Sequence, residues 1–370
     1  MKKILKYVCI LCFASLLYLS TIPNAFADVI SFSGSGYMSK NGEKVIIAGK
    51  SITLSYDYSN YKYIRKISGT INGETVFSES PLSKTIGSIT FEIDENQSGN
   101  LSIRVEYTNK NLTRLGATYN ITVIPPQKIS DTEVIIEGNI SYTGKSLTPP
   151  VTVKHDGKEL EKGHDYTLTF ANNINAGTAR VTVTGINEYS GSKQVSFNIS
   201  KAKMSSVSIA AIKNQTYTGK AIKPTLSVKL GTVKLTNGID YTVKYTSNTK
   251  IGKATITLTG KENLTGSKKV TFKIIPKGTT ISKLTAATKK ITAKWRKQAV
   301  QTTGYQIQFS TTKTFKTYKT LTISKVSILS KTLNNLSANK TYYIRIRTYK
   351  TVSGTKYYSN WSAYKSVKVK

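Results

Sequence analysis

The chain contains only two cysteines, and neither is expected in the exported protein. Cys9 and Cys12 lie within residues 1–27, where three lysines precede a short apolar stretch that ends near an Ala25-x-Ala27 cleavage site. This order of features predicts a secretory signal peptide. An N-terminal membrane anchor is the alternative, and the short apolar stretch and the cleavage site argue against it. The exported chain then has no disulfide, no thiolate metal ligand and no cysteine nucleophile.

Long apolar segments and helix signals are missing after residue 27. No later stretch is apolar for long enough to span a bilayer, so no transmembrane segment is expected once the signal is removed. Runs such as "ARVTVTG" and "KVTFKII" alternate apolar and polar residues instead, and Gly, Asn and Pro separate them. This two-residue period is typical of half-buried strands, and many short strands predict an all-β chain of β-sandwich modules.

The sequence contains an internal repeat of 75 residues. Residues 127–201 align without a gap with residues 202–276, so that "NISYTGKSLTPPV" at Asn139 recurs as "NQTYTGKAIKPTL" at Asn214. A fixed period of this length predicts two small modules in tandem.

Acidic residues become scarce toward the C-terminus, and this loss leaves a gradient of positive charge. The net charge is +1 in the segment before the repeats, zero in the first repeat, +11 in the second and +20 in residues 277–370, which hold no Asp or Glu. On the predicted solvent face, Thr169 becomes Lys244 and Asn198 becomes Lys273. A genome-wide lysine bias is the alternative explanation, but it does not account for the missing acidic residues.

The last segment, residues 277–370, resembles a fibronectin type III domain along nearly its full length. The stretches "KITAKWRK", "GYQIQFS" and "LNNLSANKTYYIRIRTY" carry the resemblance. It implies a sandwich with Trp295 in the core and Tyr342 as the corner tyrosine. The other expected core residues are Ile291, Ala293, Tyr305, Ile307, Phe309, Ile344 and Ile346.

Within this segment, Arg345, Arg347 and Trp361 resemble the arginine–tryptophan ladder of some type III domains. The two arginines alternate with core isoleucines, so both are expected on the outer face with Trp361 between their guanidinium groups. The ladder is interpreted as a surface brace, with an aromatic binding platform as the alternative.

The 75-residue units resemble tandem all-β repeats of secreted surface proteins from Gram-positive bacteria, through "YTGK", a following proline and "G-x-DYT". That resemblance implies spacers or binding modules without an attached activity. "GKSITLSYDYS" and "GNLSIRVEYT" indicate an immunoglobulin-like sandwich in residues 28–126. The predicted fold class is therefore all-β, a string of immunoglobulin-like and fibronectin type III-like sandwiches after a signal peptide. The predicted order is 1–27 signal, 28–126 immunoglobulin-like, 127–201 and 202–276 repeats, and 277–370 type III.

No catalytic residue, cofactor or metal ion is predicted, and the chain is interpreted as a non-enzyme. His155 and His164 are replaced in the second repeat by Leu230 and Ile239, so the shared fold does not need imidazole. A metal site made of these histidines and their neighbouring aspartates is disfavoured, because Asp165 recurs without the histidines and is interpreted as a turn residue.

"DENQSGN", which starts at Asp94, resembles the beginning of a calcium loop. The twelfth position of such a loop should be an acidic ligand, and here it is Val105. The stretch is instead predicted to be a polar hairpin turn between two strands.

These observations predict a secreted, extracellular or cell-wall-associated protein whose basic C-terminal half binds an anionic cell-wall polymer or polysaccharide. The alternative is an adhesin or carbohydrate-binding accessory protein, with the tyrosine-rich residues 28–126 recognising a glycan or protein ligand. Nucleic acid is a weaker candidate because the chain is exported. The candidate polymer-binding residues are Lys289, Lys290, Lys294, Lys297, Lys313, Lys316, Lys319, Arg345, Arg347 and Trp361.

Overall fold

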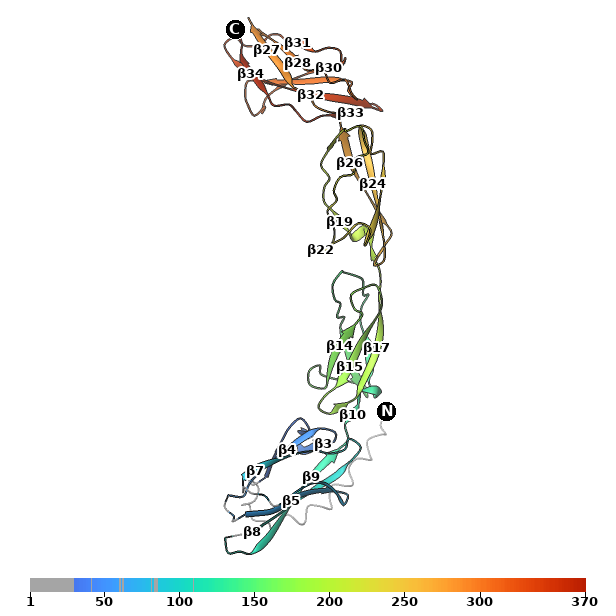
Figure 1. Cartoon of the computed structure of the whole chain (residues 1–370), viewed down its shortest axis with the longest axis vertical. Helices are drawn as coiled ribbons and strands as arrows, with labels where there is room; N and C mark the ends of the chain where they lie inside the picture. Colours follow the sequence, from blue (N-terminus) through green and yellow to red (C-terminus); the bar gives the residue numbers. More distant parts are fainter. Residues whose placement is uncertain are drawn as a thin grey trace, which may run out of the picture. The chain divides into compact units, whose positions relative to one another are not determined.

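A computed structural model describes most of the chain after the predicted signal peptide, which itself lies outside the described residues with both cysteines. The described residues are 30–40, 42–59, 61, 63–80, 82, 86–108 and 110–370. They contain no α-helix, and their strands run from β1 to β34 (Figure 1). The chain divides into two compact units, and the division falls inside the first repeat. One unit consists of the residues up to Gly138 with Pro149–Ala171 and Arg180–Phe197, and the other of Asn139–Thr148, Asn172–Ala179 and Asn198–Lys370.

The N-terminal segment forms two sheets around one core. Alternate residues of β4 and β8, such as Leu54 and Ile103, are fully buried in the same apolar cluster, as expected when two inner sheet faces meet. The first sheet has the order β1 (Ile30–Ser33), β4 (Ser51–Asp57) and β7 (Ile86–Glu92). The second has the order β2 (Tyr37–Lys40), β3 (Glu43–Ile47), β9 (Arg114–Ile124), β8 (Gly99–Thr108), β5 (Tyr63–Ile71) and β6 (Glu74–Glu79).

The predicted hairpin at "DENQSGN" is wrong, because the strands on either side of it belong to different sheets. β7 pairs with β4, whereas β8 pairs with β5 and β9. The turn chemistry itself is present, since the Asp94 carboxylate accepts a hydrogen bond from the Asn96 backbone N–H at 2.9 Å. Val105 is buried in the core. A local turn motif therefore fixes the bend but not the partner of the next strand.

The two repeats have largely matching elements at the same shift of 75 residues; β20 (Gln215–Thr216) of the second repeat corresponds only to the isolated bridge between Ser141 and Ser200 in the first. In each repeat a short three-stranded sheet and a longer sheet follow a single 3-10 turn. The first repeat contains β10 (Gln127–Lys128), η2 (Ile129–Asp131), β11 (Glu133–Ile136), β12 (Val151–His155), β13 (Lys158–Glu159), β14 (Tyr166–Ala171), β15 (Gly177–Gly185), β16 (Tyr189–Ser190) and β17 (Ser192–Ile199). The second contains β18 (Ala202–Lys203), η3 (Met204–Ser206), β19 (Ser208–Ile209), β20 (Gln215–Thr216), β21 (Val228–Leu230), β22 (Val233–Lys234), β23 (Tyr241–Thr246), β24 (Gly252–Gly260), β25 (Leu264–Thr265) and β26 (Ser267–Ile275).

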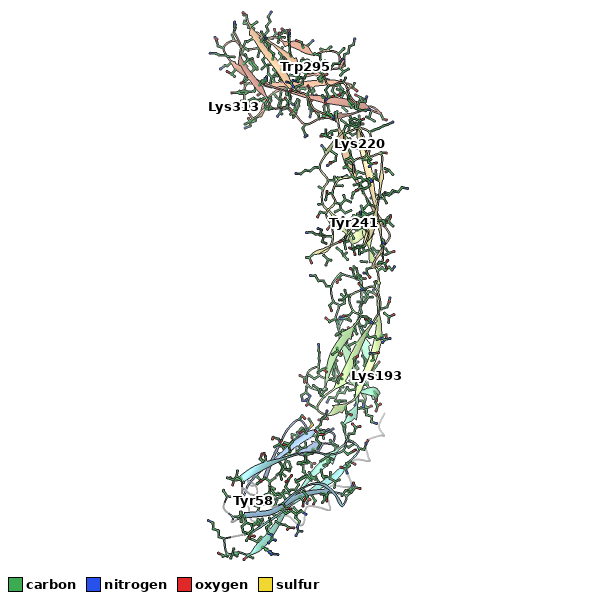
Figure 2. The ribbon with its side chains drawn as sticks, in the orientation of Figure 1. Tyr58, Lys193, Lys220, Tyr241, Trp295 and Lys313 are labelled. Atoms are coloured by element: carbon green, nitrogen blue, oxygen red, sulfur yellow. The ribbon has the colours of Figure 1, made fainter. Side chains whose placement is uncertain are left out.

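One lysine in each repeat stabilises the fold by donating hydrogen bonds to backbone carbonyls. Lys193, labelled in Figure 2, donates to the Ser130 carbonyl at 3.0 Å and also to the Thr132 carbonyl. Its counterpart Lys268 donates to the Ser205 carbonyl at 3.1 Å. These carbonyls belong to the 3-10 turn and its flank, so the lysine holds the turn against the long sheet. Such lysines are not available for a ligand.

The C-terminal segment is a sandwich of two antiparallel sheets. The predicted core is confirmed: Trp295 and Tyr305 are buried at 3% and 0% exposure, and Phe309 and Tyr342 lie at the edge of the same cluster. The Tyr342 hydroxyl accepts a hydrogen bond from the Ser337 N–H at 3.2 Å, which is the expected corner contact. One sheet consists of β27 (Ile281–Ala287), β28 (Lys290–Trp295) and β31 (Ser330–Leu333), and the other of β30 (Lys319–Ile323), β29 (Gly304–Ser310), β32 (Thr341–Val352), β33 (Thr355–Tyr358) and β34 (Lys365–Lys368).

The fold class is therefore the predicted one, an all-β chain of immunoglobulin-like and fibronectin type III-like sandwiches. In the described part of the chain, no helix has the length and apolar character needed to cross a membrane.

Candidate functional site

The predicted arginine–tryptophan arrangement is present on the outer face of β32. Ile344 and Ile346 are fully buried, so the alternating Arg345 and Arg347 project from the opposite face. The Trp361 ring centre lies 4.7 Å from the guanidinium carbon of Arg345 and 4.2 Å from that of Arg347. Both distances are within cation–π range.

The ladder is longer than the sequence analysis predicted. Phe315 lies 4.0 Å from the guanidinium carbon of Arg345, and Tyr358 lies 3.9 Å from that of Arg347. Phe315 comes from the loop after β29, so only the folded chain brings it to the stack. Tyr358 ends β33, the strand that pairs with β32 beyond the arginines.

Two glutamines on β29 complete the ladder, and the sequence analysis missed them. Gln308 accepts hydrogen bonds from Arg345 at 3.0 and 2.7 Å, and Gln306 accepts from Arg347 at 2.8 and 2.5 Å. Gln306 and Gln308 alternate with the core residues of "GYQIQFS" and lie directly opposite the arginines in the register. The sequence contained enough information to find them, because the alternation in "GYQIQFS" by itself places both amides on the outer face.

The geometry of the ladder favours the brace interpretation over the binding platform. Each guanidinium lies between two aromatic rings and donates two hydrogen bonds to an amide oxygen, so little of it is left for a ligand. Desolvation lowers the pKa of Arg347 and of Arg345 from the ordinary value. Arginine still remains protonated at neutral pH, so the cation–π contacts persist.

Replacing Trp361 by alanine should lower the free energy of unfolding of the C-terminal segment by about 1–2 kcal/mol, because two cation–π contacts are lost. The free energy of unfolding would be measured by chemical denaturation, with hydrogen exchange in residues 277–370 as the readout. Trp361→Phe is the matched control and should recover part of the loss, because it keeps an aromatic face between the arginines. Weaker polymer binding without any loss of stability would contradict the brace and favour the binding platform.

The seven predicted lysines are all exposed, but they do not share one face. Lys290 and Lys294 lie on β28, whereas Lys319 begins β30 in the other sheet. The remaining four are Lys289 in the turn before β28, Lys297 just after β28, and Lys313 and Lys316 in the loop before β30. Figure 2 shows Lys313 at the edge of the C-terminal sandwich and Trp295 within it.

Two lysines that the sequence analysis missed lie beside Lys289. The Lys289 N–H donates to the Lys370 carbonyl at 3.1 Å, and the Val369 N–H donates to the Lys340 carbonyl at 3.0 Å. The backbones of three lysines therefore lie near one another at one end of the sandwich: Lys289 in the β27–β28 turn, Lys340 in the β31–β32 loop and Lys370 just after β34. No sequence spacing relates these positions, which explains why pattern analysis did not group them.

The basic half of the chain contains no internal ion pair. Residues 202–370, all of which the structure describes, hold thirteen basic residues in the second repeat and twenty beyond it, against two acidic residues. The ion pairs found in the described chain are Lys40–Glu188, Arg104–Glu106 and His164–Asp165, all before residue 202. The positive charge of the C-terminal half therefore has no ionic partner within the described residues.

The histidines and their aspartates have local partners. The hydrogen bond with Asp165 raises the pKa of His164 above its ordinary value. Asp165 also accepts the Glu161 N–H at 2.7 Å, and Asp240 accepts the Thr236 N–H at 2.6 Å in the second repeat. The aspartate therefore closes the same turn with or without a histidine. Among the described residues, no three His, Cys, Asp or Glu side chains are grouped as metal ligands would be.

The tyrosines of "YDYSNYKY", residues 56–63, divide between core and surface. Tyr56 and Tyr58 are buried, and burial raises the pKa of Tyr58 well above its ordinary value. Tyr61 packs on Tyr107 with ring centres 4.5 Å apart, and Tyr63 is 42% exposed. Most of the aromatic surface proposed for ligand recognition therefore belongs to the core cluster.

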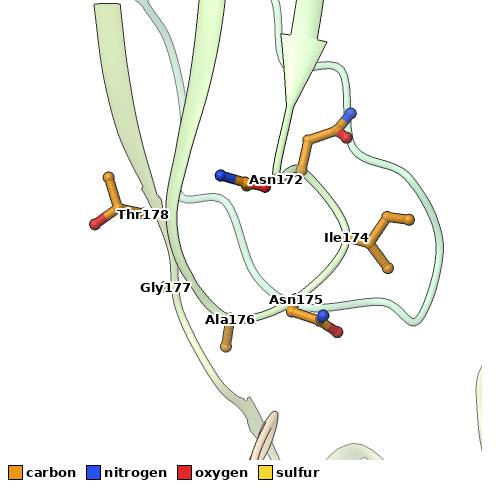
Figure 3. Close-up of a pocket in the computed structure, with 7 residues that line it drawn as sticks. Asn172, Ile174, Asn175, Ala176, Gly177 and Thr178 are labelled. Carbon is orange, nitrogen blue, oxygen red and sulfur yellow. The ribbon is translucent and has the colours of Figure 1, made fainter.

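A shallow depression lies at the loop Asn172–Thr178, which leads from β14 into β15 (Figure 3). Its polar residues are mostly asparagines, and the Asn173 amide donates to the Leu147 carbonyl at 2.8 Å. Asn248 makes the same contact with the Ile222 carbonyl in the second repeat. The contact is therefore part of the shared fold rather than a ligand site.

Comparison with known proteins gives distant similarities. No family model matches the chain, and no curated protein does. Domains A168–A170 of titin share 9% identity and a TM-score of 0.22, covering 92% of this chain and 99% of that one. The chicken CNTN1 FN1–FN3 domains share 11% identity and a TM-score of 0.22, covering 92% and 98%.

The fibronectin(III)-like modules of CbhA from Clostridium thermocellum share 12% identity and a TM-score of 0.26, covering 46% of this chain and 94% of that one. Fibronectin type III-like domains are thus among the structural neighbours of this chain. The fold class rests on the strand order and register described above.

Proposed function

We propose that this chain is a secreted, non-catalytic modular protein of the cell surface. Its basic half, residues 202–370, associates with an anionic cell-wall or extracellular polymer and presents the N-terminal segments. The observation that carries the proposal is the uncompensated charge: thirty-three basic side chains accompany two acidic ones, and none of them has an ionic partner in the part of the chain that the structure describes.

Physical chemistry favours a polymeric partner. A surface with excess lysine attracts polyanions over a Debye length of about 10 Å at 0.1 M salt. Binding releases the counterions condensed on the polymer, so the affinity falls as the salt concentration rises. A small anion offers neither effect, because it neutralises one or two charges at a time.

The test uses the full chain and purified cell walls. The protein should sediment with the walls at low ionic strength and return to the supernatant at about 1 M salt, where the Debye length shrinks to about 3 Å. Hydrogen exchange of the bound protein should show protection within residues 202–370. Walls stripped of their phosphate-containing polymers are the control and should retain much less protein.

The alternative function predicts a different footprint. Protection confined to residues 28–126, with binding that high salt does not reverse, would contradict the proposal and favour a glycan- or protein-recognising adhesin.

A further inference from the structure

The outer face of the long sheet in the second repeat has an unusual composition. On β24, Ala254, Ile256 and Leu258 are fully buried, so the residues between them face outward. Across β23, β24 and β26, every outward side chain on this face is a lysine, a threonine or a serine. These residues are Lys244, Lys253, Lys269, Lys273, Thr242, Thr246, Thr255, Thr257, Thr259, Thr271 and Ser267.

The register brings the four lysines into two rows. Lys253 lies directly opposite Lys273. Lys244 and Lys269 flank Thr257 on either side, because each of them pairs with it. The side chains in the first row are about 5 Å apart at Cβ, and those in the second are about 10 Å apart, given the spacing of strands. The rows are four residues apart along β24, which corresponds to about 13 Å.

The outer face of β23, β24 and β26 with its four lysines is the lysine face, and no neighbouring group among the residues that the structure describes compensates its positive charge. All four lysines are exposed, and none has an ion pair or a side-chain hydrogen bond within the described protein. Like charges placed directly opposite each other in a sheet are destabilising, and no carboxylate on this face offsets them. Lys268 on the same strand differs, because it reaches the Ser205 carbonyl and supports the fold.

The first repeat carries the same scaffold without these lysines. The counterparts of the four lysines are Thr169, Thr178, Gln194 and Asn198, and all four are exposed. The buried alternation of β15 matches that of β24. Because the fold does not require lysine at these positions, the charge on the second repeat points to a ligand.

We infer that the lysine face of the second repeat binds a linear phosphodiester polymer. This inference rests on the proposed function and names its contact surface. Lysine binds phosphate as a point charge that can approach a tetrahedral group from many directions, whereas arginine forms planar bidentate pairs with carboxylate and phosphate alike. The face has no arginine, and its hydroxyl groups can donate to phosphate oxygens between the lysines. Its two rows of charge suit a chain with repeated phosphates better than a single anion.

The test compares two full-length variants that lose the same net charge. The face variant carries Lys244→Thr, Lys253→Thr, Lys269→Gln and Lys273→Asn, the residues of the first repeat. The control variant carries glutamine at four exposed lysines outside β23, β24 and β26, namely Lys203, Lys223, Lys229 and Lys234. Both are titrated with purified poly(glycerol phosphate), and with polygalacturonate as a carboxylate polymer, over a range of salt concentrations.

The face variant should bind poly(glycerol phosphate) at least tenfold more weakly than wild type. Its plot of log affinity against log salt should lose roughly 3 units of slope, because each phosphate contact contributes about 0.7–0.9. The control variant should stay within about threefold of wild type.

Each other outcome overturns a defined part of the inference. Equal losses in both variants would show that net charge matters and this face does not, while the proposed function survives. Equal affinity for polygalacturonate, with an equal loss in the face variant, would overturn the phosphodiester assignment. If wild-type protein binds neither polymer, the proposed function fails together with the inference.

Discussion

Replacing Trp295 by alanine should destabilise the C-terminal segment by about 3–5 kcal/mol, the usual cost of removing a large aromatic side chain from a core. Trp295 is 3% exposed, and its ring meets Tyr305 edge-on with centres 5.5 Å apart. The Tyr305 hydroxyl in turn donates to the Val326 carbonyl at 3.2 Å and accepts the Gln298 N–H at 3.1 Å. The indole therefore supports both the apolar cluster and a pair of loop contacts.

The size of this loss matters because a segment of this length has a total stability of only about 5–14 kcal/mol. Hydrogen exchange in the full-length protein would locate the effect. The amides of residues 277–370 should lose protection, whereas those of the N-terminal segment should exchange as in wild type. Uniform loss of protection along the chain would contradict an effect of Trp295 that is confined to this sandwich.

Trp295→Phe is the matched control and should remain within about 1 kcal/mol of wild type. The Trp295 Nε1 is buried and has no hydrogen-bond partner among the described residues. An unpaired buried donor costs about 1–3 kcal/mol of folding free energy. The smaller phenylalanine ring fills less of the core than the indole, but it has no N–H and so removes this cost. A phenylalanine variant as unstable as the alanine variant would show that the indole N–H is paired after all.

Replacing Gly304 by alanine should cost about 2–3 kcal/mol. A Cβ atom at this position would lie 2.0 Å from the Ile323 carbonyl oxygen and 3.0 Å from the Tyr349 hydroxyl. Ile323 belongs to β30, whose pairing with β29 begins next to Gly304. The carbonyl can move only if that pairing is disturbed, and overpacking of this kind outweighs the backbone entropy that alanine would recover.

Gly278→Ala is the comparison for that variant. The nearest atom to its added Cβ would be the Ser359 Oγ at 3.7 Å, an ordinary contact. The expected change in the free energy of unfolding is within about 0.5 kcal/mol. Thermal unfolding of both variants would measure the difference, and equal stability of the two would contradict the clash at Gly304.

Alternation predicted a large part of the fold and of the ladder. It placed Ile291, Ala293 and Trp295 in the core and both ladder arginines on the outer face, and all of them lie there. It could also have placed Gln306 and Gln308, since they follow the same rule on β29. It could not place Phe315, because side chains in a loop do not alternate between two faces as those of a strand do.

Alternation did less well with the candidate lysines. Exposure of all seven was predictable, because lysine is seldom buried without a partner. Their division between two sheets was not, since it depends on which strands pair. The same limit explains the error at Asp94, where a correctly recognised turn joins two sheets instead of two neighbouring strands.

The sequence by itself determined the strand content, the repeat, the identity of most core positions and the gradient of charge. Each of these is a local or compositional property, and side-chain alternation along a strand converts it directly into an inner or outer face. Only the tertiary structure decided which outer residues are neighbours. The pairing of β23, β24 and β26 sets Lys253 opposite Lys273 and brings Lys244 and Lys269 to either side of Thr257. Register joins residues distant in sequence, so a lysine that is unremarkable in its own strand becomes part of a surface with a defined spacing of charge.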